Sequence, residues 1–181
     1  EYLMDVIINV FPTDFHLKTL EAFLESIGKL KDGVNVKQIV INLLDRLTSY
    51  STDNDIPVDI PVFDIFSDNV RSIVEKKPNM ETNDIIELQA ALLEFSLQCA
   101  KTREDKARYS KTVMEFCMRL IKAAVGNEIP QDCATLCTNI LRSVTEALLL
   151  HVLDSEVSVF KEFMSMMPWK HRINVARHVL K

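Results

Sequence analysis

Glycine is the residue that this sequence most clearly lacks. Its 181 residues include only 3 glycines, whereas average usage of about 7% would give roughly a dozen. The sequence contains no GxGxxG motif and no Walker A motif, which excludes the common phosphate-binding loops. A sandwich or barrel, which needs many tight turns, is also disfavoured.

Long uncharged stretches are missing as well. The longest run without Asp, Glu, Lys or Arg is the nine residues Cys133–Leu141, whereas a transmembrane helix needs about 20 apolar residues. The net charge of −5 and the pI near 5.4 argue against nucleic acid as a partner. The chain starts at Glu1 inside an apolar pattern with no visible signal peptide, so we expect a fragment of a longer cytoplasmic protein.

The residue types that build metal centres are present, but their spacing is wrong for one. Cys133 and Cys137 lie four apart with no histidine near them, whereas zinc sites use paired thiolates with further ligands at set distances. We therefore interpret all four cysteines as free thiols in the core of a cytosolic protein. These cysteines are Cys99, Cys117, Cys133 and Cys137.

The four histidines also form no recognisable catalytic pattern. His16 follows Thr13 and Asp14, which are candidate caps for a helix start, so we expect a partly exposed ring there. His171 and His178 lie two turns apart, too far for one ion, and we expect them on a solvated face. The sequence predicts no catalytic, cofactor-binding or metal site residues and no cofactor, and it identifies no partner-binding residues.

Apolar residues recur every three or four positions along almost the whole chain. No run of β-branched residues bounded by hairpin turns interrupts this pattern, so helices are the only elements predicted. The third helix, 36–50, is apolar over so much of its girth that we expect it in an inner layer. The predicted helices span residues 2–11, 14–30, 36–50, 62–77, 84–100, 105–124, 131–142, 144–153, 155–166 and 168–181.

These helices pair as hairpins with short turns. The predicted pairs are 14–30 with 35–50, 61–77 with 84–100, and 105–124 with 131–142, and their starts fall 47 and 44 residues apart. That spacing is close to the ~40–47-residue unit of HEAT and armadillo arrays. We expect an all-α, right-handed superhelical α-solenoid of HEAT-like helical hairpins. Residues 1–181 would form a single segment of about four hairpins, while a helical bundle stays a structural alternative.

Charge is unevenly distributed along the chain. Residues 53–68 hold five Asp and no basic residue, whereas residues 101–111 carry a net charge of +3. The last predicted helix contains no acid but holds Lys170, Arg172, Arg177 and Lys181, and its apolar stripe is Trp169, Ile173, Ala176 and Leu180. Such blocks are usually solvated faces, and the sharper interpretation is a basic edge that contacts an anionic membrane, an acidic partner or a neighbouring repeat. We expect the Met-rich stretch 163–169 in the core.

Three ordered blocks of sequence carry a family resemblance. They are Tyr2–Pro12 followed by Asp14-Phe-His-Leu17, then Val34–Leu47, and finally Val62–Ser67. These blocks resemble the middle of the large α-solenoid subunit of retromer, the vacuolar protein sorting-associated protein 35 family. The resemblance is specific over about residues 1–75, thins to pattern over 76–125, and is mainly helix spacing beyond that.

The resemblance implies a non-enzymatic scaffold in the retromer cargo-recognition complex. In that family a long HEAT-like solenoid holds an arrestin-like subunit near one end and a phosphoesterase-like subunit near the other. With sorting nexins it binds cargo tails at endosomal membranes and retrieves transmembrane cargo to the Golgi or plasma membrane. The Pro-Arg-Leu-Tyr-Leu motif that grips the arrestin-like subunit is absent here, so we expect the connecting middle of the solenoid, peripheral to endosomal membranes.

Two other hypotheses stay open at this stage. One is a HEAT- or armadillo-type adaptor from another coat or transport complex, which the helical periodicity would equally fit. The other is an all-helical enzyme that uses His16 or His151, although the sequence shows no convergent titratable groups around either residue.

Overall fold

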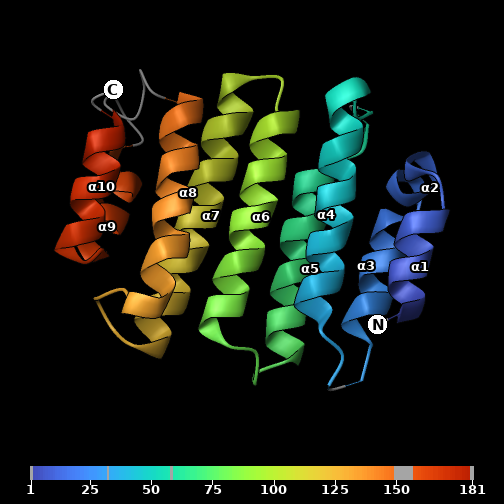
Figure 1. The fold of residues 1–181 in the computed structure, drawn as a ribbon, viewed down its shortest axis with the longest axis horizontal. Coiled ribbons are helices and arrows are strands. Elements are labelled where there is room, and N and C mark those ends of the chain that lie inside the picture. Colours follow the sequence, from blue (N-terminus) through green and yellow to red (C-terminus); the bar gives the residue numbers. More distant parts are fainter. Residues whose placement is uncertain (1, 32, 58, 149–156, 180–181) are drawn as a thin grey trace. The chain divides into compact units, whose positions relative to one another are not determined.

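The computed structural model describes residues 2–31, 33–57, 59–148 and 157–179. Within these ranges every regular element is a helix and no strand is present, which confirms the all-α prediction (Figure 1). None of these helices combines the length and the apolar character needed to cross a bilayer. The helices are α1 (Tyr2–Val10), α2 (Thr13–Lys18), α3 (Leu20–Gly28), α4 (Val36–Asp53), α5 (Val62–Lys76), α6 (Thr82–Cys99), α7 (Arg103–Ala124), α8 (Gln131–Leu148), α9 (Val157–Met166) and α10 (Trp169–Val179).

The chain divides into two compact units, Glu1–Met80 and Glu81–Lys181. In the first unit α3 packs beside α5, α1 packs beside α4, and contacts between α3 and α4 join the two pairs. The predicted hairpin of 14–30 with 35–50 is therefore confirmed. The predicted pairing of 61–77 with 84–100, the superhelical hand and the single continuous segment all concern how the units join, and they stay predictions.

In the second unit, alternate helices share a layer. Helix α8 packs against both α6 and α10, while α7 packs against α9. Consecutive helices α6, α7 and α8 also contact one another and so join the two layers, which confirms the predicted hairpin of 105–124 with 131–142. Packing of each helix on its second neighbour within a layer is the arrangement of a HEAT-like solenoid.

Helix α4 is buried as its composition predicted. The side chain of Asn35 caps its first turn by accepting a hydrogen bond from the Gln38 backbone N–H at 3.0 Å. Six aliphatic residues of this helix are at most 3% exposed, namely Val36, Ile39, Val40, Leu43, Leu44 and Leu47. Their burial on contact with α1, α2 and α3 excludes a peripheral position for α4 in its unit.

Two helix boundaries differ from prediction at segments rich in short polar side chains. Helix α4 continues to Asp53, beyond the predicted loop start, and the hydroxyls of Ser51 and Thr52 there donate to the Thr48 carbonyl. The predicted helices 131–142 and 144–153 are joined in α8, where the buried Thr145 hydroxyl donates to the Leu141 carbonyl at 2.7 Å. Residues 149–156 lie outside the described part of the chain.

The predicted helix 14–30 is instead broken at Thr19. Both the backbone N–H and the hydroxyl of Thr19 donate to the Phe15 carbonyl, at 3.0 and 2.7 Å, and Thr19 itself leaves the helical conformation at φ −112° and ψ 12°. The single predicted helix is therefore two short helices, α2 and α3. Gly33 and Gly126 have φ near +95°, at +96° and +94°, which explains glycine at these two turns.

Candidate functional site

His16 lies in the core of the first unit and is not a partly exposed cap residue. Its side chain is 1% exposed, and its Nε2 lies 3.2 Å from the Ile8 carbonyl oxygen. Burial lowers the pKa of His16 below its ordinary 6.5; the Ile8 hydrogen bond opposes that shift and the nearby positive charge of Arg46 adds to it. The Nδ1 atom of this ring has no hydrogen-bond partner. The sequence did not predict this burial because the ring is covered by Ile8 of α1 and Phe23 of α3, which come from other helices.

Asp14 does not pair with His16. Its carboxylate accepts a 2.6 Å hydrogen bond from the Tyr50 hydroxyl, which joins α2 to α4. Helix α2 follows Pro12 and has no side-chain cap, so the prediction of Thr13 or Asp14 as cap is wrong. An acid–base pair is therefore not assembled here. His151, the other candidate catalytic histidine, lies outside the described residues.

The buried cysteines behave as predicted for core thiols. Cys117, Cys133 and Cys137 are free and buried, whereas Cys99, which was also predicted to lie in the core, is half-buried. Burial raises the pKa of Cys137 to about 12 and that of Cys117 well above its ordinary value, so these groups stay as protonated thiols near neutral pH. Across the described residues, no three His, Cys, Asp or Glu side chains are arranged to hold a metal ion.

His171 and His178 lie at the joint between α8 and α10, so the prediction of a solvated face is wrong. The His171 Nδ1 lies 2.9 Å from the Thr138 hydroxyl, and the His178 Nε2 lies 2.7 Å from a carboxylate oxygen of Glu146. Val175, fully buried, lies between them along the helix. The face of α10 that contacts α8 is therefore built from two histidines and one valine.

Three residues of the predicted apolar stripe of α10 consequently point outward, while the fourth, Leu180, lies outside the described residues. Trp169 is 61% exposed and Ile173 is 40% exposed, and Ala176 on the same side is also exposed. Of the Met-rich stretch 163–169 that was predicted to lie in the core, Phe163, Met166 and Met167 are buried, whereas Trp169 is exposed. In the sequence, the presence of basic residues on both sides of the stripe was the signal that could have indicated an outward face.

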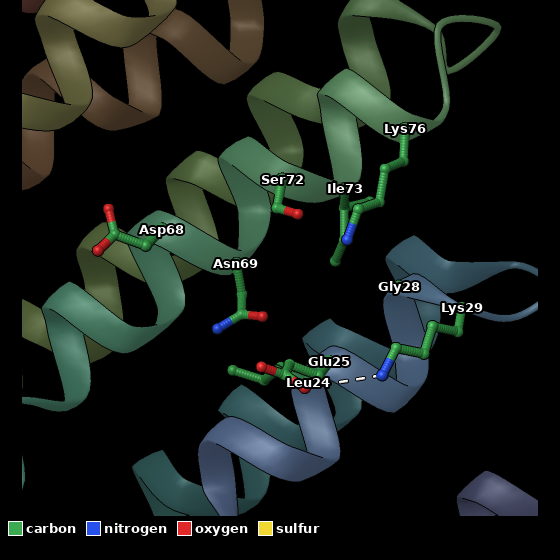
Figure 2. A pocket seen from close by; sticks show the side chains of 9 residues that line it. All are labelled: Leu24, Glu25, Gly28, Lys29, Asp68, Asn69, Ser72, Ile73 and Lys76. Atoms are coloured by element: carbon green, nitrogen blue, oxygen red, sulfur yellow. Dashed lines mark ion pairs between the residues drawn. The ribbon is translucent and has the colours of Figure 1, made fainter.

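A shallow groove lies between α3 and α5 in the first unit (Figure 2). It encloses about 340 Å³. A Cβ added at Gly28 would meet only Ile73, at an ordinary 3.7 Å. The Lys29 and Glu25 side chains in the groove form an exposed ion pair at 3.7 Å. The groove residues are Leu24, Glu25, Gly28, Lys29, Asp68, Asn69, Ser72, Ile73 and Lys76.

This groove lacks the features of an active site. Active sites combine a largely apolar pocket with a few convergent polar groups, whereas most of the residues that line this groove are charged or polar. Its exposed ion pair contributes little to stability or to specificity. The groove is therefore a polar recess on the surface of stacked helices.

Large exposed apolar side chains gather instead on the first and last helical segments. Of those in the described residues, only Val125 lies away from these two places. Because isolated exposed apolar residues are ordinary but contiguous ones indicate contact surfaces, these two regions are the candidate interaction surfaces. The residues are Tyr2, Leu3, Val10, Phe11 and Phe15 at one, and Trp169 and Ile173 at the other.

Comparison with known proteins finds one family over the whole chain. Residues 1–181 match the family described as Vacuolar protein sorting-associated protein 35. The protein of that name from Dictyostelium discoideum is 42% identical over 123 residues, which are 67% of this chain and 15% of that protein.

Two further relatives show the same partial coverage. Vacuolar protein sorting-associated protein 35C from Arabidopsis thaliana is 30% identical over 126 residues, 67% of this chain and 16% of that protein. Vacuolar protein sorting-associated protein 35 from Schizosaccharomyces pombe is 44% identical over 50 residues, 28% of this chain and 6% of that protein. The matched region is thus a small part of the length of each relative.

Proposed function

This chain belongs to the vacuolar protein sorting-associated protein 35 family, and from that membership we propose that it is a non-catalytic scaffold segment of the retromer cargo-recognition complex. In this role it supports retrieval of transmembrane cargo from endosomes to the Golgi and to the plasma membrane. Its work is mechanical: it fixes the distance and direction between the parts of the complex that bind partners.

The observation that supports this proposal most strongly is the layered packing of the helices. Helix α8 contacts α6, α7 and α10, and its buried side includes Cys137, Ile140, Leu141 and Val144. In such an array each helix is held by its neighbours, so a displacement at one end is passed to the next hairpin. Stacked helices of this kind suit a spacer better than a site for chemistry.

The proposed partners follow from the family and bind elsewhere in the parent protein. They are the arrestin-like and phosphoesterase-like retromer subunits, sorting nexins and cargo tails. The protein would act in the cytoplasm, peripheral to endosomal membranes, without binding nucleic acid. We propose that residues 1–181 form one solenoid segment between the two subunit-binding ends.

Affinity capture of the full-length protein that contains this segment tests the proposal. We expect capture through the arrestin-like subunit to recover both this protein and the phosphoesterase-like subunit. As a control, capture from cells that lack the full-length protein should recover the arrestin-like subunit without the phosphoesterase-like one. Capture through the full-length protein itself that recovers neither subunit would contradict a retromer role and would favour an adaptor of another transport complex.

A further inference from the structure

The last turn of helix α4 leads directly into an acidic segment. Thr52 lies in that turn with an exposed side chain, and the exposed residues Asp53 and Asp55 follow it one and three positions later. Asn54, between the two carboxylates, has left the helix and is extended at φ −136° and ψ 141°. No Lys or Arg occurs from residue 53 to residue 68. A surface hydroxyl is therefore followed by a segment whose charged residues are all acidic.

Hydrogen bonds close this end of α4 and connect it to α2. The backbone N–H and the side-chain amide of Asn54 both donate to the Tyr50 carbonyl, at 3.0 and 3.2 Å. The Thr52 hydroxyl donates to the Thr48 carbonyl at 3.3 Å, which is long for a bond between two oxygens. The Tyr50 hydroxyl donates to the Asp14 carboxylate of α2 at 2.6 Å. The last turn of α4 therefore carries a link between two helices.

Charge distinguishes Thr52 from Thr102, a second exposed threonine that also lies three residues before an aspartate. The Thr102 hydroxyl donates to the Asp105 carboxylate at 2.7 Å and accepts from the Asp105 backbone N–H at 3.1 Å, so it caps helix α7. Lys101 and Arg103 flank Thr102 in the sequence. Kinases distinguish their substrates by charge pattern, so an enzyme that binds acidic segments favours Thr52 over Thr102.

We propose that Thr52 is a phosphorylation site for a protein kinase that selects acidic sequences, and that the phosphate opens the last turn of α4. The Thr52 Oγ1 attacks the γ-phosphorus of ATP, the bond from that phosphorus to the β-phosphate oxygen breaks, and ADP leaves. The hydroxyl proton passes to the catalytic aspartate of the kinase. Basic side chains in the substrate groove of such a kinase bind the carboxylates of Asp53 and Asp55. The inference does not depend on which complex contains the protein.

A phosphate on Thr52 opposes the helical conformation of this turn. It carries a charge of about −1.5 to −2 at pH 7, and it lies beside Asp53 and Asp55 at the negative end of the helix dipole. The residues four and three positions earlier, Thr48 and Ser49, are uncharged and supply no counter-ion on this side of the helix. The modified side chain also loses the proton that it donates to the Thr48 carbonyl. The phosphate therefore destabilises the last turn.

Opening of this turn reaches helix α2 through Tyr50. Its carbonyl accepts the two bonds from Asn54 that close the turn, and its hydroxyl donates to Asp14. When the turn opens, the Tyr50 ring loses its fixed position, and its hydrogen bond to Asp14 is lost as well. Phosphorylation thus loosens the contact between α2 and α4 inside the first unit. The change is reversible, because a phosphatase restores the hydroxyl by hydrolysis.

Phosphorylation of the full-length protein tests the site. The protein is incubated with ATP and casein kinase II, a kinase that selects acidic sequences, and tandem mass spectrometry locates the phosphate. We expect phosphate on Thr52 and none on Thr102. Full-length protein isolated from its own cells in the presence of phosphatase inhibitors should carry the same phosphate on Thr52.

Matched variants test whether the neighbouring carboxylates direct the kinase. The double variant Asp53→Asn with Asp55→Asn should slow phosphorylation of Thr52 by about tenfold or more, because two charge contacts with the kinase are lost. Asp64→Asn with Asp68→Asn removes the same charge farther along the acidic segment and should leave the rate unchanged. Circular dichroism of each variant checks that its helices are retained.

Hydrogen exchange of the phosphorylated full-length protein tests the effect on α4. The backbone amide of Asn54, which donates to the Tyr50 carbonyl, should exchange about tenfold faster or more after phosphorylation. The Lys77 amide closes the end of α5 in the same way, by donating to the Ile73 carbonyl at 2.9 Å, and should exchange at its original rate. Thr52→Val removes the hydroxyl without adding charge, so its exchange at Asn54 should stay close to that of the unmodified protein.

Three outcomes would overturn the proposal. The first is the absence of phosphate from Thr52, either after treatment with the kinase or in the protein from cells. The second is a rate of phosphorylation that the loss of Asp53 and Asp55 does not change. The third is a phosphorylated Thr52 with unchanged exchange at Asn54, which would show that the last turn of α4 stays closed.

Discussion

Helices α4 and α10 carry similar apolar stripes in sequence, but the fold treats them differently. In α4 six aliphatic side chains are buried, whereas in α10 Val175 is buried and Trp169 and Ile173 are exposed. Burying a Val, Leu or Ile side chain is worth about 1.5–3 kcal/mol, so the orientation of α4 is fixed by many such contributions. The orientation of α10 depends on one valine and two histidine contacts. Sequence pattern alone therefore predicts the first helix better than the second.

The largest expected effect is in the centre of α4. Leu43 is fully buried, so Leu43→Ala should lower the free energy of unfolding by about 2–5 kcal/mol through lost burial and a residual cavity. Urea unfolding measures this difference. Ile173→Ala, on the exposed side of α10, serves as the matched control. It should lower the free energy of unfolding by less than about 0.5 kcal/mol, the usual limit for surface substitutions. Equal losses of unfolding free energy at Leu43 and Ile173 would contradict the conclusion that one side chain is buried and the other exposed.

A smaller effect is expected on the inner face of α10. Val175 is fully buried, and Val175→Ala removes two methyl groups, which should cost about 1–2 kcal/mol. The same urea measurement, with Ala176→Ser on the exposed side as control, compares the two faces of one helix. A larger loss of unfolding free energy from the Ala176 variant would mean that Ala176, and not Val175, lies on the buried face of α10.

A pH effect of intermediate size is expected at His16, which is buried against Ile8 of α1 and Phe23 of α3. Because burial lowers the pKa of His16 in the folded state, the unfolded chain takes up the proton first as the pH falls below about 6.5. The stability that the neutral ring contributes is present above that pH and is lost as the pH falls toward the lower folded-state pKa. The slope from this group cannot exceed about 1.4 kcal/mol per pH unit.

The contribution of His16 can be isolated by substitution. His16→Gln keeps an amide donor for the Ile8 carbonyl but does not titrate, so its unfolding free energy should vary less between about pH 7 and pH 5 than that of the unchanged protein. Chemical denaturation at several pH values gives both curves. If the two curves of unfolding free energy against pH run parallel, the pKa of His16 is the same in the folded and unfolded states, which would contradict this prediction.

The smallest effect is expected at the edge of the joint between α8 and α10. The side chains of His178 and Glu146 are 24% and 61% exposed, and pairs at this degree of exposure contribute at most about 1 kcal/mol. Glu146→Gln should therefore cost less than Val175→Ala. A greater cost would mean that the polar edge, and not the valine, fixes the orientation of α10.

How much the sequence could predict depends on whether a feature is set by local pattern or by packing against helices distant in the sequence. The helices, the burial of α4, the turns at Gly33 and Gly126, and the core thiols each follow from local pattern or composition. The break at Thr19 and the continuation of α8 past Ser143 could not be read in advance, since short polar side chains bond equally well inside a helix or at its end. The burial of His16 and the inward direction of His171 depend on neighbouring helices that no local window contains.

The central claim is that this segment works as a stiff spacer, and one replacement tests it directly. In the full-length protein, residues 1–181 are exchanged for a flexible Gly/Ser linker of the same number of residues, and return of a transmembrane cargo from endosomes is measured in cells. The account predicts that the arrestin-like and phosphoesterase-like subunits still bind while cargo return is lost. Cargo return at the original rate, with a flexible linker in this place, would contradict it.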